Sequence, residues 1–285
     1  MQRNVETFLG CDSEYEESKI VIFGAPFDST TSYRPGARFA SRVMRAESYG
    51  LETYSPYQNL DVTDYKIFDG GDLELCFGDT NLALEDIKNF AEKIFADEKI
   101  PVMIGGEHLV TLGMFRAAVE KYPDINVIHF DAHTDLRDDY LGAKLSHATV
   151  IRRIWDIIGD GKIFQFGIRS GDRPEFEFAK EHTRLQKFNF AGLGKVIGEV
   201  RNKPVYLTID LDVLDPAVFP GTGTPEAGGV TFWELLDAAL KVVNQSQVVA
   251  VDLLELSPPY DSSGISTATA LKILREIILA VANKI

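Results

Sequence analysis

The segment that most constrains the fold of this chain runs from Val127 to Asp135 and reads VIHFDAHTD. Its first half is an apolar run of strand type, and its second half carries Asp131, His133 and Asp135 at alternating positions. Two carboxylates and an imidazole at the end of a buried strand are costly to desolvate unless a cation or another partner compensates them. The segment therefore predicts a buried strand that delivers ligands to a metal ion.

Two other apolar runs also end in residues of ligand type. Residues 205–212 (VYLTIDLD) close with Asp210 and Asp212, and residues 101–108 (PVMIGGEH) close with a glycine turn and His108. In parallel α/β sheets, active sites form beyond the carboxyl ends of the strands. These residues, although far apart in sequence, are therefore expected to converge.

Chain length and composition limit the class of protein. At 285 residues, with 45% hydrophobic and 25% charged residues, the sequence is typical of an ordinary globular protein, and we expect one domain over residues 1–285. The net charge of −14 disfavours nucleic acid and anionic membranes as partners and favours a cationic ligand. Cys11 and Cys76 are far apart, which argues against a disulfide framework or a thiolate zinc site.

The localisation prediction depends on two absences in the sequence. The segment MQRNVET at the amino terminus lacks the basic and apolar blocks of a secretory signal, and no apolar run approaches membrane-spanning length. We expect a cytoplasmic protein.

Apolar periodicity predicts an alternation of strands and helices along the chain. Strands are expected at residues 19–24, 100–104, 125–130, 163–166, 205–209 and 248–254. Helices are expected at residues 36–48, 81–96, 109–121, 148–158, 174–180, 231–243 and 268–282. Parallel strands need crossover connections and are buried on both faces, so this alternation predicts an α/β fold with a mainly parallel sheet covered on both sides.

The predicted ligands combine carboxylate oxygen and imidazole nitrogen, with no thiolate. This set suits manganese better than structural zinc, while cobalt, nickel and iron stay open. Six ligands exceed what one ion would use, whereas two ions would use them all if Asp131 and Asp210 bridge and His108 and His133 each serve one ion. Two ions about 3.5 to 4 Å apart can activate a water as a nucleophile, so hydrolysis is the expected reaction class. A single Asp-x-Asp pair often caps a helix, but three such strand ends together favour metal.

Several further motifs accompany the ligand strands. They are RPGARF at 34–39, GGEH at 105–108, HFDAHTD at 129–135, SHAT at 146–149, FGIRS at 166–170, TIDLDVLDP at 208–216, PGTGTP at 220–225 and DLLE at 252–255. Together they resemble the arginase and agmatinase family of ureohydrolases, most closely its bacterial agmatinases, over nearly the whole chain.

The resemblance implies a three-layer α/β/α sandwich of arginase type, with a mainly parallel sheet of about eight strands and two Mn²⁺ ions per subunit. By resemblance, the first ion would be held by His108, Asp131, Asp135 and Asp210, and the second by Asp131, His133, Asp210 and Asp212. The resemblance also implies a homo-oligomer, either a trimer or a hexamer.

The resemblance further implies a reaction in which a metal-bridging hydroxide attacks a guanidinium carbon, giving an intermediate that collapses to urea and an amine. Glu255 would bind and orient the guanidinium, and Asp135 would accept a hydrogen bond from the intermediate. His147 would contact the substrate and shuttle a proton to the departing amine, while Thr224 would line the guanidino pocket. Structural alternatives stay open: Glu255 as a helix-flanking acid and His147 as a helix cap.

The substrate has several possible identities at this stage. The first hypothesis is hydrolysis of agmatine to putrescine and urea. The alternatives within the family are arginase, guanidinobutyrase, guanidinopropionase and formimidoylglutamase activities, and a substrate of the amino acid type would need a group that recognises its α-carboxylate. Outside the family, a non-catalytic metal-binding regulator would be expected to lose ligands, and a dinuclear phosphohydrolase would need basic residues near the ligand strands.

Overall fold

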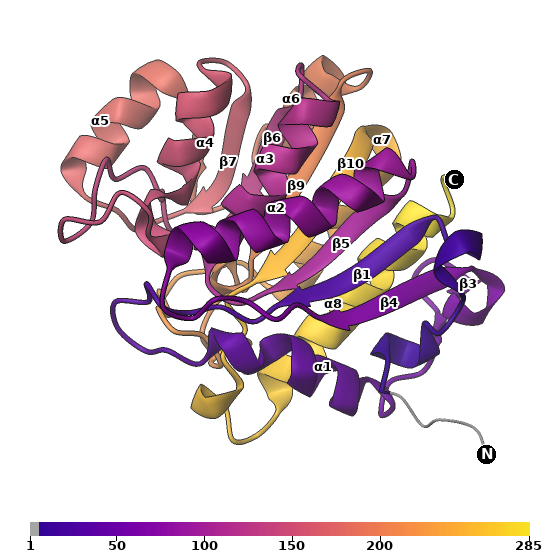
Figure 1. Cartoon of the computed structure of the whole chain (residues 1–285). Helices are drawn as coiled ribbons and strands as arrows, with labels where there is room; N and C mark the ends of the chain where they lie inside the picture. The colour runs from indigo at the N-terminus through magenta and orange to yellow at the C-terminus, as the bar shows by residue number, and fades with distance from the viewer. Residues whose placement is uncertain (1–5) are drawn as a thin grey trace.

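An eight-stranded sheet runs through the computed structural model, which describes residues 6–285 (Figure 1). Its order is β4-β1-β5-β10-β9-β6-β7-β8, and every neighbouring pair is parallel. The strands are β1 (Ile20–Ala25), β4 (Ile67–Asp72), β5 (Ile100–Gly105), β6 (Asn126–Phe130), β7 (Ile163–Ile168), β8 (Arg184–Lys187), β9 (Pro204–Asp210) and β10 (Gln247–Leu254). The predicted parallel α/β sheet is confirmed.

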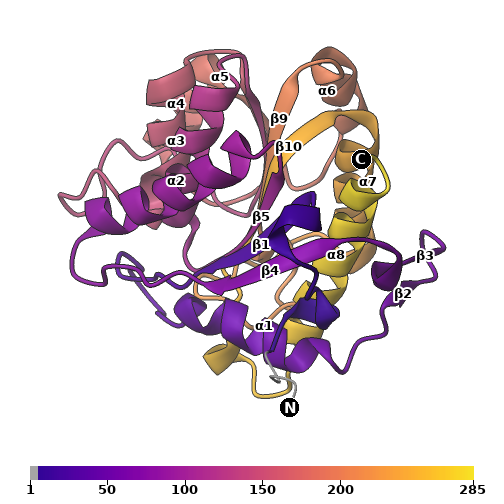
Figure 2. The same cartoon turned by 45° about the vertical axis from the view of Figure 1, so that its right-hand side comes forward.

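Helices cover both faces of this sheet (Figure 2). One layer contains α2 (Thr80–Ala96), α3 (Thr111–Lys121), α4 (Val150–Ile158) and α5 (Arg173–His182), and the other contains α1 (Ala40–Ser48), α6 (Leu193–Val200), α7 (Phe232–Gln245) and α8 (Ile265–Ala282). Successive residues of β1 point to opposite layers: Ile22 packs in the same cluster as Met44 of α1, and Phe23 in the same cluster as Leu84 of α2. The strand is therefore apolar throughout, as a strand buried on both faces must be.

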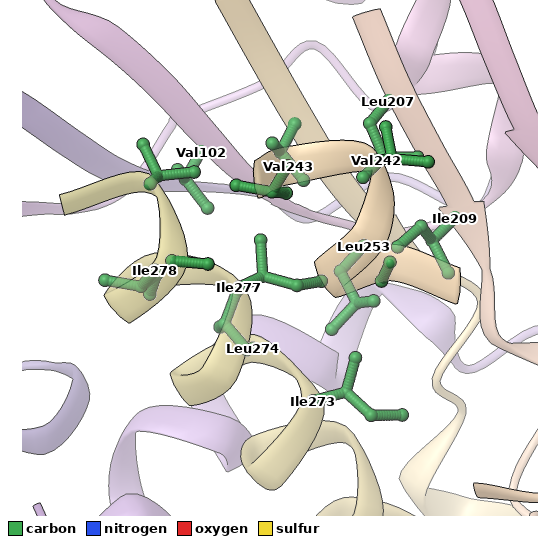
Figure 3. Close-up of a cluster of buried hydrophobic side chains, with 14 of the residues drawn as sticks. Val102, Leu207, Ile209, Val242, Val243, Leu253, Ile273, Leu274, Ile277 and Ile278 are labelled. Atoms are coloured by element: carbon green, nitrogen blue, oxygen red, sulfur yellow. The ribbon is translucent and has the colours of Figure 1, made fainter. Parts of the chain in front are cut away.

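The layer formed by α7 and α8 packs on the sheet through branched aliphatic side chains (Figure 3). Ile273 and Ile277 of α8 are fully buried, and they belong to the same core cluster as Val242 of α7 and Leu253 of β10. Truncating one such side chain to alanine would cost about 2 to 5 kcal/mol, because the surrounding core relaxes only in part. This core holds the strands β5, β10 and β9 in fixed positions, and with them the polar residues at their carboxyl ends.

Apolar periodicity did not predict the two edge strands, β4 and β8, or the helix α6. The strand β4 reads IFDGGD and β8 reads RLQK, and both lie at the ends of the strand order, where one side has no partner strand. Their composition therefore lacks the continuous apolar run that marks a central strand. Helix α6 carries Gly194 and Gly198, which lower its helix propensity. A short antiparallel hairpin of β2 (Tyr54–Ser55) and β3 (Leu60–Asp61) was also not predicted.

Two further observations concern the whole described chain. Within residues 6–285, none of the helices has the length and apolar character that a membrane crossing requires. Cys11 and Cys76 are both free thiols, the first buried and the second partly exposed. Residues 1–5, which form most of the segment used for the localisation prediction, lie outside the described residues.

Candidate active site

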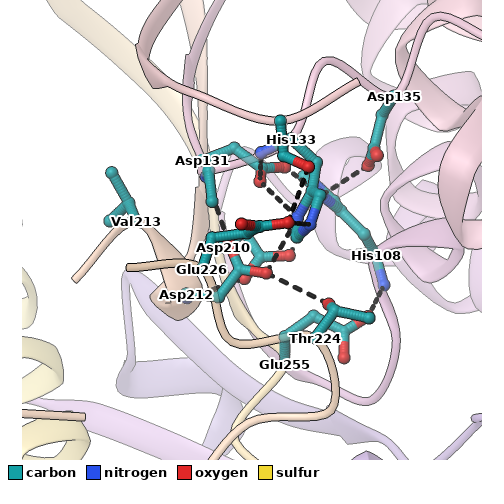
Figure 4. A network of polar contacts seen from close by, with 12 residues as sticks. His108, Asp131, His133, Asp135, Asp210, Asp212, Val213, Thr224, Glu226 and Glu255 are labelled. Carbon is teal, nitrogen blue, oxygen red and sulfur yellow. Dashed lines mark hydrogen bonds and ion pairs between the residues drawn. The ribbon is translucent and has the colours of Figure 1, made fainter. Parts of the chain in front are cut away.

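The predicted ligand residues meet at the carboxyl ends of three strands in the middle of the sheet (Figure 4). His108 follows β5, the residues Asp131, His133 and Asp135 follow β6, Asp210 ends β9 and Asp212 lies just beyond it. The fourth strand of this group, β10, is hydrogen-bonded between β5 and β9 and leads directly to Glu255. Parallel topology thus brings together residues more than a hundred positions apart, as the sequence predicted.

The more buried part of the site, here called the inner half, consists of His108, Asp131, Asp135 and Asp210. Nδ1 of His108 lies 3.0 Å from Asp131 Oδ2, 3.1 Å from Asp135 Oδ2 and 3.5 Å from Asp210 Oδ2. Its other ring nitrogen, Nε2, lies 2.9 Å from Thr208 Oγ1. Nδ1 is buried and has no hydrogen-bond partner of good geometry, although three carboxylates face it. Such an arrangement is suited to a cation between the nitrogen and the oxygens.

The outer half consists of His133, Asp131 and Asp212, so that Asp131 belongs to both halves. Nδ1 of His133 lies 2.9 Å from Asp212 Oδ2 and 3.5 Å from Asp131 Oδ1. The hydroxyl of Thr224 donates to Asp212 Oδ2 over 3.2 Å, and Nε2 of His133 lies 3.8 Å from a carboxylate oxygen of Glu226. The His133 side chain is 22% exposed, against 1% for His108. His133 is therefore the more accessible of the two imidazoles.

Donor atoms close enough to share an ion form two overlapping groups among the described residues. One contains His108, His129, Asp131 and Asp135, and the other contains Asp131, His133 and Asp212. His129 was not predicted as a site residue, while Asp210 lies outside the first group despite its contact with His108. The sequence did carry a signal for His129, because in a strand it points to the same side as Asp131, two residues later.

Burial and mutual repulsion oppose ionisation of the carboxylates in this site. Burial, together with Asp212 and Asp131, raises the pKa of Asp210 well above its usual value. Burial and the charge of Asp131 raise the pKa of Asp135 to about 7. Because these carboxylates are held together at close range without solvent, a positive charge among them would be strongly favourable.

The imidazoles take up part of that positive charge as protons. Burial lowers the pKa of His108, but the close carboxylates of Asp131, Asp135 and Asp210 outweigh this and raise the pKa well above the ordinary value. Burial likewise lowers the pKa of His133, but Asp212 and Asp131 outweigh burial and raise this pKa well above the ordinary value. In the absence of metal, these protons compensate the carboxylates, and a divalent cation would displace them. The residues present therefore fit a divalent metal.

Glu255 sits across the pocket from Asp135 and is tied to the glycine turn before His108. Its backbone N–H donates to Gly106 O over 3.0 Å, and its Oε1 accepts from the His108 backbone N–H over 2.8 Å. The residue has a left-handed φ of 62°, which a non-glycine residue adopts only when its surroundings impose it. Burial, with Glu107 and Asp212, raises the pKa of Glu255 well above its usual value. A cationic substrate would therefore stabilise the ionised form.

The glycines of the turn are required by close packing. A Cβ at Gly105 would lie 1.8 Å from Leu254 Cδ2, and one at Gly106 would lie 1.9 Å from the carbonyl oxygen of Phe27. The second contact is with backbone and cannot be relieved by a side-chain rotation. The two glycines thus allow His108 to approach Glu255 closely.

His147 lies on a 3₁₀ turn, His147–Thr149, that precedes α4. The helix predicted from residue 148 therefore begins two residues later than expected. Ser146 caps the turn, and the His147 backbone N–H donates to Thr30 Oγ1 over 3.0 Å. Its Nε2 is buried without a hydrogen-bond partner. Burial and the nearby imidazoles of His133 and His108 lower the pKa of His147 to about 4. The ring is thus a neutral group that can accept a hydrogen bond.

Glu107 is a buried residue of the site that the sequence prediction missed. Its carboxylate accepts hydrogen bonds from Thr30 Oγ1 over 2.5 Å and from Thr31 Oγ1 over 2.9 Å. Burial raises its pKa to about 7, although these hydrogen bonds oppose the shift. Since Thr30 also accepts from His147, the carboxylate of Glu107 holds the loop that positions His147.

A cavity of about 230 Å³ opens onto these groups. The predicted site residues that line it are His108, His133, Asp135, His147, Asp210, Thr224 and Glu255. Asp131 and Asp212 do not line it. Arg137, Tyr140, Asp172 and Glu175, which were not predicted as site residues, line its remaining wall. The structure thus brings all the predicted residues together, while the role of each stays a prediction.

Comparison with known proteins identifies the family. The family model described as "Arginase family" matches residues 18–280. The chain belongs to the arginase family. An agmatinase from Bacillus cereus is 47% identical over 277 residues, which cover 96% of each chain. The family resemblance seen in the sequence is therefore confirmed, and membership supports a ureohydrolase enzyme.

Solved structures agree with this assignment. A crystal structure from Clostridium difficile, assigned provisionally as an agmatinase, is 56% identical with a TM-score of 0.92 and covers 95% of this chain and 99% of its own. Proclavaminate amidino hydrolase from Streptomyces clavuligerus is 32% identical with a TM-score of 0.88, over 98% of both chains. The fold is thus the arginase-type three-layer sandwich that the resemblance implied.

Proposed function

We propose that this protein is a dinuclear manganese hydrolase that converts agmatine and water into putrescine and urea. The observation that carries the proposal is the pair of overlapping donor groups that share Asp131 at the bottom of a cavity lined by Glu255 and His147. The 47% identity to an agmatinase over 96% of the chain supports the substrate.

The proposed ligands divide between the two halves of the site. His108, Asp131, Asp135 and Asp210 would hold one ion, and Asp131, His133, Asp210 and Asp212 would hold the other. Carboxylates with a minority of imidazoles suit Mn²⁺, and Nδ1 of His108, buried without a partner, is free to bind it. When bound, two such ions supply Lewis acidity and lower the pKa of a water molecule.

Glu255 would bind the guanidinium group of the substrate. Its carboxylate lines the cavity and is held from behind by the backbone of His108, which fixes its direction. A carboxylate can accept two parallel N–H donors from a guanidinium, and the ion pair is strong in a buried site. This contact would place the central carbon of the guanidinium over the metal ligands.

Asp135 and His147, which both line the cavity, would transfer the protons that the reaction requires. Addition of hydroxide to a guanidinium gives a neutral tetrahedral species, and its collapse requires a proton on the departing amine nitrogen. Asp135 Oδ2 faces the inner half and would accept the hydroxyl proton of this species. His147, whose Nε2 lacks a partner in the protein, would exchange a proton with the amine.

The wall of the cavity favours a substrate without a carboxylate. Arg137 is the one Arg or Lys residue among those lining the cavity, and its Nη1 lies 2.6 Å from Asp172 Oδ2. Its Nε lies 3.5 Å from Glu175 Oε2, so the guanidinium is already compensated by two acids. An ammonium tail fits this surrounding better than the α-carboxylate of arginine would.

The test is urea release from a panel of agmatine, arginine, guanidinobutyrate, guanidinopropionate and formimidoylglutamate. We expect agmatine to be preferred, activity to require added Mn²⁺, and chelation to abolish it. A clear preference for arginine would contradict the substrate, and full activity in a preparation free of transition metals would contradict the dinuclear site. Phosphomonoester hydrolysis without urea release would favour the phosphohydrolase alternative.

Five broader expectations accompany the proposal. A single ureohydrolase domain over residues 1–285 is supported by a sheet whose strands come from residues 20 to 254. Assembly as a trimer or hexamer, a place in putrescine formation and a cytoplasmic location stay predictions, and so does the absence of nucleic-acid and membrane partners. Size-exclusion chromatography with light scattering would test the assembly.

A further inference from the structure

His129 lies in the centre of the site without an assigned role. It is fully buried on β6, two residues before Asp131, and its Nε2 lies 2.7 Å from Asp131 Oδ2. Its ring centroid is 5.0 Å from that of His108, and its donor atom falls in the same group as those of His108 and Asp135. From distance alone, His129 could be a further ligand of the inner half, through a ring nitrogen.

The side chain of Gln165, on the neighbouring strand β7, decides which nitrogen of His129 carries the proton. The Gln165 Nε2 lies 2.8 Å from Thr134 O, and a carbonyl oxygen only accepts, so this atom must be the amide nitrogen. On the other side, Gln165 Oε1 accepts from Thr183 Oγ1 over 3.0 Å. The orientation of the amide is therefore fixed by partners at both of its ends.

The same amide nitrogen lies 3.1 Å from Nδ1 of His129. Because this nitrogen can only donate, Nδ1 of His129 must accept, and the ring proton must be on Nε2. An Nε2–H points at Asp131 Oδ2 and has no lone pair to offer a metal ion. We propose that His129 is a positioning residue that donates a hydrogen bond to Asp131 and is not a metal ligand, an inference that rests on the proposed metal site.

The consequence for Asp131 is that both of its oxygens are held. Oδ1 accepts from the His133 backbone N–H over 2.5 Å, and Oδ2 accepts from His129. The carboxylate therefore cannot rotate, and it presents Oδ2 to the inner half and Oδ1 to the outer half. Hydrogen bonds of this kind, which orient a ligand from behind, typically contribute 10- to 100-fold to metal affinity.

The first test observes the wild-type protein directly and uses a substitution only to assign the signal. In metal-free protein labelled with ¹⁵N-histidine, only five histidines contribute to the spectrum. We expect one of them, assigned to His129 by its loss in His129→Gln, to show a proton on Nε2, slow exchange of that proton and an unprotonated Nδ1. A proton on Nδ1 with a bare Nε2 would overturn the inference, because Nε2 would then be free to bind metal.

The second test measures Mn²⁺ affinity by the electron paramagnetic resonance signal of the unbound ion. We expect His129→Phe, which fills the space without a donor, to weaken binding about 10- to 100-fold, and His129→Gln, whose amide can still donate, to retain most of the affinity. His182→Phe is the matched control, because His182 contacts Asp160 on the surface and should leave the affinity unchanged. Wild-type affinity in His129→Phe would overturn the inference.

Melting of the metal-free proteins guards against a general folding defect, since a positioning role predicts weaker metal binding at temperatures at which both variants are fully folded. An equal loss of affinity in the Phe and Gln variants would also overturn the inference, since it would indicate a ligand. Absence of urea release by a wild-type protein that binds Mn²⁺ would contradict the proposed function and leave the affinity comparison intact.

Discussion

The two halves of the metal site differ in what holds them in place. The inner half is built on strand ends in the interior, where His108 is 1% exposed and its nitrogen faces three carboxylates. The outer half relies on His133, which is 22% exposed, and on Asp212, which is supported by the loop residue Thr224. Groups fixed by the sheet are preorganised, whereas groups fixed by loops adjust more easily. We infer that the inner half sets the affinity for metal.

The largest effect should come from the residue that the two halves share. Asp131→Asn would neutralise the proposed bridging carboxylate while keeping its shape, so both ions should be lost. We expect kcat/KM to fall at least about 1000-fold, which corresponds to roughly 4 kcal/mol. Atomic emission spectroscopy measures the metal content, and the rate of urea release gives kcat/KM. Retention of one tightly bound ion would show that the halves are independent.

Glu255→Gln should separate substrate binding from metal binding. The amide keeps one acceptor for the His108 N–H but loses the charge that would pair with a guanidinium, so we expect kcat/KM to fall about 100-fold with both ions retained. Kinetics and metal analysis on the same preparation measure the two properties. Loss of metal would mean that Glu255 belongs to the inner half.

Matched substitutions of His108 and His133 test whether the inner half contributes more to metal affinity than the outer half. We expect His108→Asn to weaken Mn²⁺ binding about 100-fold and His133→Asn about 10-fold, because His108 is fully buried and faces three carboxylates, whereas His133 is partly exposed and faces two. Isothermal titration of metal-free protein gives both affinities. The reverse order would refute the inference that the inner half sets the affinity.

The smallest expected effect is a pH-dependent change in the unfolding free energy of the metal-free protein. The pKa of Asp135 is raised to about 7 in the folded state, so the folded protein holds this proton while the unfolded chain, with a pKa near 3.8, has lost it. This contribution to stability is complete below the unfolded pKa and is lost as the pH rises through about 7. Between pH 5 and pH 7, wild type should therefore lose about 2 kcal/mol relative to Asp135→Asn.

Urea denaturation of both metal-free proteins across this range would measure the difference. A constant difference in unfolding free energy would show that Asp135 is already ionised at pH 5. Saturating Mn²⁺ should reverse the trend in wild type, because metal competes with the same protons.

Much of the fold followed from the sequence because its central strands are buried on both faces. The runs at β5, β6, β9 and β10 are nearly all apolar, and parallel topology then dictates that the ligand residues after them converge. The edge strands β4 and β8 lack this signal, and they were missed. The convergence of the ligands was therefore predictable from local patterns.

The supporting residues were less accessible to sequence analysis. His129 could have been noticed from strand alternation, but its hydrogen bond with Gln165 depends on the pairing of β6 with β7, a register that no local pattern reveals. The contact of Glu107 with Thr30 likewise joins residues 77 positions apart across a loop. Such contacts depend on tertiary geometry rather than on the residue types alone.

The glycine turn before His108 has a practical consequence for protein design. A Cβ at Gly106 would lie 1.9 Å from the Phe27 carbonyl oxygen, so the histidine can approach its neighbours only where a bare backbone precedes it. A copy of the ligands grafted onto another scaffold would have to include this turn and the strand end that the turn packs against. Transplanting the side chains alone would leave the imidazole too far from its carboxylates for them to bind one ion together.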